Sequence, residues 1–270
     1  MPRRTCRAIV ILLVGVSAAC GGGGSSPISP STTTTTTTTT TPTTPTATSV
    51  TWSFNGSAWA ASGTAPACPS PLVFSAPADV TKATAVLYPG QTRGGNYKAH
   101  GGLLFANGTN TTIQVTAPMA GYVYRGVRYI ESGEVQYLFD IINTCGVMHR
   151  FDHLLTLSSR FQAIADTFPP AGASSATTNV AAGQNVTEGE VIATAVGFRV
   201  SGNTSFDWGA YDLRQKNAAS ADPAWLAGHS GEQAPYALCW LNNLSTSSAA
   251  LLRALPGGDF IAGRTSDYCK

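Results

Sequence analysis

Histidine and aspartate side chains are the residues best suited to chemistry in the stretch Lys98–Arg214. His100 lies in the segment KAHGGLLF. The segment HRFDHLLTL contains His149 and His153, which are four residues apart and would share one face of a strand. The segment FDWGAYDLR contains Asp207. Because zinc in proteins is bound by imidazole and carboxylate groups, these residue types fit metal-assisted hydrolysis.

Other common catalytic patterns are missing from the sequence. It contains no Gly-x-Ser-x-Gly elbow and no pair of glutamates typical of a glycosidase. The segment AHGG lacks the Gly-x-x-x-x-Gly-Lys spacing of a phosphate-binding loop. Five tryptophans would either stack on sugars or form a buried aromatic core, namely Trp52, Trp59, Trp208, Trp225 and Trp240.

The elements that would position these residues are short strands. Runs rich in Val, Ile, Tyr, Phe and Thr alternate with turn signals such as Asn-Gly and Glu-Ser-Gly. We expect strands at Val50–Phe54, Ala85–Tyr88, Gly102–Phe105, Thr112–Val115, Gly121–Tyr124, Val135–Ile142, Val147–Phe151, Glu190–Val196, Phe198–Val200, Trp208–Leu213 and Tyr236–Leu241. Helices are expected only at Ser158–Asp166 and Ser247–Leu255. The pattern indicates an all-β fold.

Five phrases in this stretch resemble the lysostaphin-type (LytM) zinc endopeptidases, which cut peptide cross-bridges in bacterial cell walls. The phrases AHGGLL, APMAGYV, FDHL, VAAGQNVTEGEVIA and FDWGAYD occur in the family's order. The resemblance implies an antiparallel β sandwich, or hybrid barrel, with a duplicated hybrid motif. It implies a peptidase-like core over residues 98–214 of a domain that spans residues 50–270.

The resemblance also shows where the family's zinc site has changed. His100 matches the first zinc ligand, but Leu104 stands in the place of the aspartate ligand. If Asp212 takes the place of the glutamate that follows the closing His-x-His pair, Trp208 and Ala210 replace both histidines. Catalytic zinc needs about three protein ligands and one open position for water. The standard site is therefore incomplete.

Several functions fit the residues that remain. The family's catalytic histidine is retained as His153, and the first expectation is a degenerate domain that binds a cell-wall peptide, a glycan or an envelope protein. Such a domain needs no cofactor, and its groove would include Asp152, Trp208 and Asp212. The alternative is an active hydrolase with a non-standard zinc set of His100, His153 and Asp207. A third possibility is a structural role in which Leu104 and Trp208 fill the groove.

A carrier function is excluded because the chain lacks the lysine that carrier domains modify. The phrases APMAGYV and VTEGEVIATAVG also resemble biotinyl and lipoyl carrier domains, which modify a lysine between the two phrases. Residues 118–197 contain no lysine.

The N-terminal segment indicates export. Residues 1–20 combine basic residues, an apolar run and small residues before Cys20, and they resemble a bacterial lipoprotein signal with Cys20 as the lipidated residue. Ser17 stands where that signal usually has leucine. Residues 21–49 are rich in Thr and Pro and predict a disordered tether. The expected location is the bacterial cell envelope, with the membrane reached through the lipid anchor alone.

Charge and cysteine content complete the expectations. Three of the sixteen basic residues lie in residues 1–20, which leaves thirteen against fourteen acidic residues and no electrostatic footprint for nucleic acid. Beyond Cys20 the chain has four cysteines and no C-x-x-C motif, a pattern that predicts two disulfides in an oxidising compartment. Three pairings are open. We favour Cys239 with Cys269, which would lock a C-terminal flank over residues 215–270, and Cys68 with Cys145.

Overall fold

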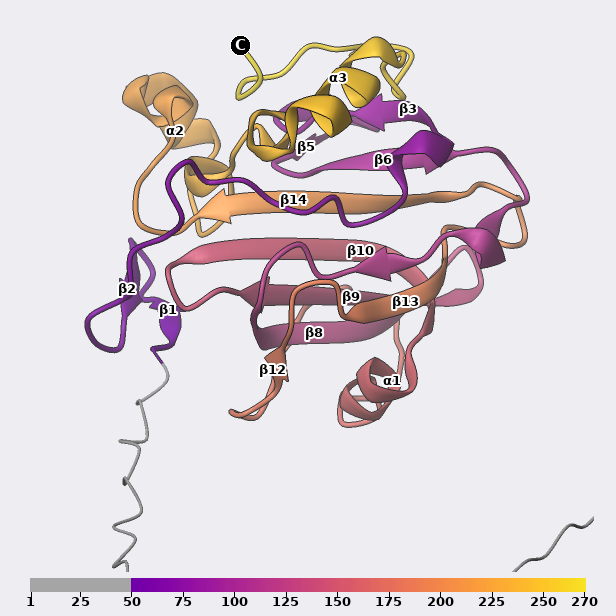
Figure 1. Ribbon diagram of the computed structural model, residues 1–270, viewed down its shortest axis with the longest axis horizontal. Helices are drawn as coiled ribbons and strands as arrows, with labels where there is room; N and C mark the ends of the chain where they lie inside the picture. The colour runs from indigo at the N-terminus through magenta and orange to yellow at the C-terminus, as the bar shows by residue number, and fades with distance from the viewer. Residues whose placement is uncertain (1–49) are drawn as a thin grey trace, which may run out of the picture. The chain divides into compact units, whose positions relative to one another are not determined.

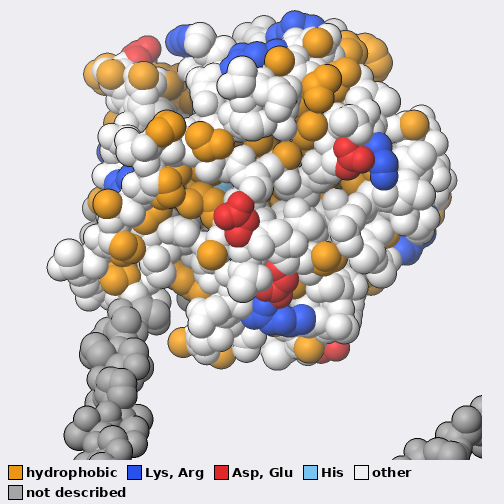
Figure 2. Space-filling view, viewed as in Figure 1, with side chains coloured by type: hydrophobic (Ala, Val, Ile, Leu, Met, Phe, Trp, Pro, Cys, Tyr) orange, Lys and Arg blue, Asp and Glu red, His pale blue; other side chains and the backbone are white. Residues whose placement is uncertain are grey.

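The computed structural model describes residues 50–270, which lie within one compact unit. The expected signal peptide, the lipidated Cys20 and the tether lie outside the described residues. No helix within residues 50–270 is long and apolar enough to cross a membrane. Figure 2 shows one face of the molecule, where charged side chains of both signs are few and lie scattered among apolar and uncharged polar ones.

A large antiparallel sheet forms the centre of the fold (Figure 1). Its main path runs in the order β11, β8, β9, β10, β14, β6, β3. The bounds of these strands are β3 Ala83–Leu87, β6 Gly101–Phe105, β8 Gly121–Glu131, β9 Glu134–Ile142, β10 Val147–Leu157, β11 Thr178–Asn179 and β14 Ser205–Asp212. The all-β antiparallel class expected from the sequence is confirmed.

The two faces of this sheet are covered by different groups of residues, because side chains alternate along each strand. On one face, Phe151 of β10 and Trp208 of β14 belong to the main hydrophobic core. On the other face, Met148 and Tyr211 belong to a second apolar cluster with Trp52. The strands are therefore buried on both sides.

A second layer covers the main core and gives the fold its sandwich character. β13 (Val191–Val196) pairs with the end of β10 and with β7 (Val115–Thr116), and β12 (Asn185–Val186) pairs with β8. In Figure 1 β13 lies in front of β9, and β12 lies beside the edge of β8. α1 (Ser159–Ala165) places Phe161 against Phe139 of β9, with the ring centroids 5.2 Å apart.

The remaining elements surround the sheet. Two hairpins are β1 Trp52–Phe54 with β2 Trp59–Ala61, and β4 Gln91–Arg93 with β5 Asn96–Lys98. Short 3-10 helices are η1 Val80–Lys82, η2 Asn110–Thr112, η3 Ala218–Ala221, η4 Ala234–Tyr236 and η5 Trp240–Asn243. Two further helices are α2 Pro223–Gly228 and α3 Thr246–Ala254.

Three expected strands differ in the structure. Residues 112–115 are not a continuous strand, because Asn110–Thr112 turns as η2 before β7 begins. Residues 198–200 form a turn with one isolated bridge between Phe198 and Asn203, since the preceding Gly197 has a φ of 82°. Residues 236–241 are the end of η4 and the start of η5, and only Ala237 bridges to the sheet.

The structure contains two disulfides with the pairing that the sequence favoured. Cys68 bonds to Cys145 in the turn between β9 and β10, and Cys239 bonds to Cys269 near the C-terminus. The C-terminal residues are more than a flank, because Trp240 is fully buried in the main core. Strand β3 likewise extends the sheet to residues before 98.

Candidate functional site

His100, Asp207 and His153 meet on the face of the sheet opposite the main core. The Asp207 Oδ2 atom lies 2.9 Å from His100 Nε2 and 3.8 Å from His153 Nε2. The three side chains are between 13% and 18% exposed. One carboxylate oxygen therefore lies between two imidazole rings at a largely desolvated place.

A β-bulge brings His153 to this group. β10 pairs Phe151 with Phe139 and then Leu154 with Tyr137, so one extra residue is inserted in β10. Without the bulge, His153 would follow Phe151 into the core. His153 adopts a φ of 61°, which is a left-handed conformation that few residues other than glycine occupy. At the same place β10 changes its partner from β14 to β13.

Two glycines bring His100 close to Asp207. Gly102 of β6 is paired with Asp207 of β14, and a Cβ atom on Gly102 would lie 2.6 Å from the Phe206 carbonyl and 3.0 Å from Asp207 Oδ1. A Cβ atom on Gly101 would lie 2.3 Å from the Leu87 carbonyl. The absence of side chains at both positions allows β6 to approach its neighbours and hold His100 beside the carboxylate.

The surroundings of Asp207 favour its charged form. Burial alone would raise the pKa of this carboxyl, but the charge and hydrogen bond of His100 outweigh that effect. His153 and Arg93 act in the same direction, and together they hold the pKa of Asp207 well below its usual range. Arg93 is buried and donates to the His100 carbonyl at 3.3 Å, which also fixes the backbone of His100.

Tyr129 and Asp152 extend the polar group on the side of His153. The Tyr129 hydroxyl donates to Asp152 Oδ1 at 2.6 Å and lies 3.3 Å from His153 Nδ1. Asp152 Oδ1 also accepts the backbone N–H of His153 at 2.8 Å. Burial and the neighbouring Asp152 raise the pKa of Tyr129, so the hydroxyl keeps its proton. These bonds fix the bulge that orients His153.

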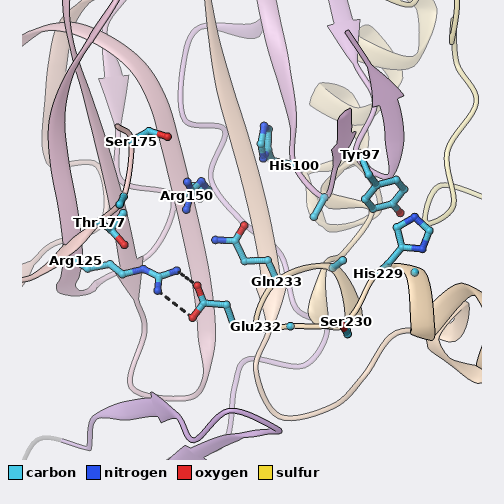
Figure 3. Close-up of a pocket in the computed structure, with 15 residues that line it drawn as sticks. Tyr97, His100, Arg125, Arg150, Ser175, Thr177, His229, Ser230, Glu232 and Gln233 are labelled. Carbon is cyan, nitrogen blue, oxygen red and sulfur yellow. Dashed lines mark hydrogen bonds and ion pairs between the residues drawn. The ribbon is translucent and has the colours of Figure 1, made fainter. Parts of the chain in front are cut away.

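A pocket of about 560 Å³ opens beside His100 (Figure 3). Its lining comes from four sheet strands or their ends, from the loop before β11 and from the loop after α2. The lining residues are Tyr97, Ala99, His100, Arg125, Arg150, Ser175, Ala176, Thr177, Gly228, His229, Ser230, Gly231, Glu232, Gln233 and Ala234. Most of them are polar, so the pocket suits a ligand with several hydrogen-bonding groups.

One wall of the pocket is aromatic. The Tyr97 and His229 rings have centroids 4.0 Å apart, and His229 stacks on Trp225 at 4.6 Å. The Tyr97 hydroxyl and Trp225 Nε1 both donate to Asp267 Oδ2, at 2.8 and 2.7 Å. The C-terminal segment thus holds this wall in place.

Three predicted residues lie elsewhere. His149 is buried on the core face, where its ring contacts Phe74 at a centroid distance of 4.8 Å, so it does not share a face with His153 as expected. Trp208 was expected in the groove, but it is fully buried on the same core face and lies 4.5 Å from Trp240. Asp212 accepts from Arg214 Nε at 2.7 Å at the end of β14 and faces away from the pocket.

Leu104 also has a structural role. A Cβ atom on Gly258 would lie 2.9 Å from Leu104 Cδ1, so the C-terminal segment covers this side chain. Because Trp208 lies in the main core and Leu104 lies under the C-terminal segment, these two side chains do not fill the pocket.

The donor types around Asp207 match a two-histidine, one-carboxylate zinc set. As arranged, however, the His100 and His153 nitrogens both face the same carboxylate oxygen, and His100 Nε2 is hydrogen-bonded to it. Within residues 50–270, no group of three or more His, Cys, Asp or Glu side chains is arranged to hold a metal ion. The imidazole of His100, which also lines the pocket, can exchange a proton or form a hydrogen bond with a ligand.

Sequence reasoning missed Tyr129, Arg125, Arg150, Asp140 and Glu232. The first two lie in the part of β8 beyond the expected end at Tyr124, where Val127 and Tyr129 continue the alternation. No local signal marks Glu232, because its position depends on how the loop between α2 and η4 folds against β8.

Comparison with known proteins gives little support for a family. No protein-family model matches the chain, and no curated protein matches it. Among solved structures, the chain is similar to Csd3 of Helicobacter pylori, with 9% identity and a TM-score of 0.35. The match covers 67% of this chain and 40% of that chain. A likeness at this level carries no inference about the present chain.

Proposed function

We propose that this chain is a lipid-anchored binding protein of the bacterial cell envelope. Its pocket takes a cell-wall peptide, a glycan or another envelope protein, and the LytM-like domain no longer cuts it. The pocket beside His100 is the observation that carries this proposal, because it joins many polar groups to an aromatic wall. The two disulfides support an exported location.

Blocking the pocket tests the binding function. Ser230 lines the pocket and is exposed, so Ser230→Trp would fill the space without removing a hydrogen bond. Ser159→Trp at the start of α1 is a matched control, since Ser159 is exposed, lies outside the pocket and makes no side-chain hydrogen bond within the described residues. We expect the purified protein to co-sediment with insoluble cell wall, and Ser230→Trp to reduce the bound fraction at least tenfold. Equal binding by both variants would contradict the pocket assignment.

The anchor has a separate test. Replacing Cys20 with alanine should prevent incorporation of labelled palmitate and move the protein from the membrane fraction to the soluble fraction. Retention of the label in Cys20→Ala would show that Cys20 is not the lipidated residue.

An active hydrolase remains a second candidate, because His100 and His153 both lie beside Asp207. Metal binding would replace the hydrogen bond between His100 and Asp207. Elemental analysis of the wild type and of His100→Ala, after growth with zinc, decides the matter. One zinc per chain in the wild type and none in the variant, together with soluble fragments released from cell wall, would favour the hydrolase over the binding protein.

A further inference from the structure

The floor of the pocket carries a row of charged residues across three neighbouring strands. Arg125 of β8 is paired with Asp140 of β9, and Asp140 is paired with Arg150 of β10. Asp140 is fully buried, and its Oδ2 atom accepts from Arg125 Nε at 2.6 Å and from Arg150 Nη1 at 3.2 Å. One buried carboxylate thus lies between two arginines.

The two arginines differ in how completely they are paired. Arg125 also binds Glu232, through Nη2 at 2.6 Å and Nη1 at 3.0 Å (Figure 3). Among residues 50–270, Arg150 makes no ion pair with a second carboxylate, although Asp152 lies close enough for its charge to raise the pKa of Arg150. Its Nε atom is buried without a hydrogen-bond partner, and within the described residues only Nη1 makes hydrogen bonds. A guanidinium has five N–H donors, and leaving them unpaired in a largely desolvated place is costly.

The arrangement at Arg125 shows how this floor receives a carboxylate. Glu232 approaches from the loop after α2 and binds the guanidinium through two oxygens, a geometry that arginine forms readily with carboxylates. Arg150 lines the same pocket, together with His100 and Gln233, which are also hydrogen-bonding groups. A carboxylate supplied by a ligand would accept hydrogen bonds from the unpaired N–H groups of Arg150.

We propose that Arg150 is the anchor for a ligand carboxylate in this pocket. The proposal rests on the binding function proposed above and narrows its ligand to an acid. The carboxylate has two possible sources, the free C-terminus of a short peptide or the acidic group of a sugar. Both would bind Arg150 in the same way, and the rest of each ligand would lie along the pocket toward Tyr97 and His229.

Matched ligand pairs test the anchor on the unaltered full-length protein, purified in detergent. The first pair is N-acetyl-alanyl-alanine and its C-terminal amide, and the second is N-acetylmuramic acid and its carboxamide. Calorimetric titration should show at least tenfold tighter binding of the acid in one pair, and that pair identifies the source. Equal affinity within both pairs would overturn the proposal.

Variants of Arg150 then locate the effect. Arg150→Lys keeps a positive charge beside Asp140 but loses the second edge of the guanidinium. We expect it to reduce the preference for the acid to less than threefold while the protein remains folded, which its circular dichroism spectrum would show. Arg199→Lys is the control, because Arg199 is exposed and lies outside the pocket. A preference that persists in Arg150→Lys and in Arg150→Gln would assign the carboxylate to another residue.

The two proposals fail in different ways. Cell-wall binding without any acid preference contradicts the anchor and leaves the binding function standing. An acid preference that disappears in Arg150→Lys, without any binding to cell wall, supports the anchor and contradicts the proposed function.

Discussion

Asp207 is the residue on which the polar group depends, because both histidines approach its Oδ2 atom. Its charge is stabilised by His100, His153 and Arg93 against the cost of burial. His100 alone of these lines the pocket, so Asp207 acts on a ligand by orienting that ring. The charge and the position of Asp207 lead to a measurable pH dependence.

Asp207→Asn should lower the free energy of unfolding by about 1–3 kcal/mol at pH 7, because the histidines lose a charged acceptor. The pKa of Asp207 is lowered in the folded state, so its contribution is present above the ordinary pKa of about 4 and is lost as the pH falls through the folded value. The difference between wild type and variant should therefore shrink below about pH 4. Denaturant titration at pH 7 and pH 3 measures it. A difference that is the same at both values would contradict the ion pairing.

His153 carries a backbone cost that can be separated from its ring. Its φ of 61° disfavours β-branched residues and suits glycine. His153→Gly and His153→Val both remove the ring, but we expect the valine variant to be less stable than the glycine variant by about 1–3 kcal/mol. Thermal unfolding of the two proteins is the measurement. Equal stability would show that the bulge relaxes.

His149 gives a different pH dependence, because its ring is buried with Nε2 unpaired. Burial lowers the pKa of His149 to about 3, from an ordinary value of 6.5. The unfolded chain therefore binds the proton first, and stability should fall as the pH decreases from 6.5 toward 3. The expected loss is about 2 kcal/mol between pH 6.5 and pH 5.

In His149→Phe the free energy of unfolding should no longer fall between pH 6.5 and pH 5 through this group. Any packing cost of the substitution is the same at each pH. Unfolding free energies at pH 7, 6 and 5 provide the comparison. Parallel slopes for the two proteins would mean that the buried imidazole is not the titrating group.

At the scale of elements, alternation along the chain was enough to predict most of the sheet. β9 lies close to its expected bounds, since its apolar residues recur at every second position, whereas β14 overlaps its expected range but begins earlier, at Ser205. The pattern could not show the bulge in β10, because one inserted residue leaves the composition of FDHLL unchanged while it reverses the face of His153. Residues 236–241 looked like a strand because they are apolar, but they are buried in 3-10 turns.

The same limit applies to the site. His100, His153 and Asp207 were singled out by residue type and order, and the structure brings them together. The charged floor was missed because Arg125, Asp140 and Arg150 become neighbours only through strand register. Such a juxtaposition has no signal in a single sequence.

The close approach of β6 and β14 yields an element-level prediction. Gly102→Ala places a methyl group 2.6 Å from the Phe206 carbonyl, so the strands must separate. We expect a loss of about 1–3 kcal/mol in the free energy of unfolding. Gly63→Ala is the control, because nothing lies within 4 Å of its added Cβ, and it should change stability by less than about 0.5 kcal/mol. If both variants unfold alike, the contact between the strands is not tight.

At the scale of the whole molecule, the segments outside the sheet hold the pocket together. The segment that ends in the Cys239–Cys269 disulfide supplies Asp267 to the aromatic wall. The loop after α2 supplies Glu232 to Arg125. A pocket assembled from distant segments and closed by polar contacts is suited to holding a ligand.

The central claim is that the protein binds cell-wall material and does not cut it. The direct measurement is incubation of the purified protein with insoluble cell wall in buffer with added zinc, followed by assay of the bound protein and of the soluble fragments. We predict that the protein sediments with the cell wall, that Ser230→Trp does not, and that no fragments are released. Release of fragments that stops with a chelator and in Asp207→Asn would contradict the claim.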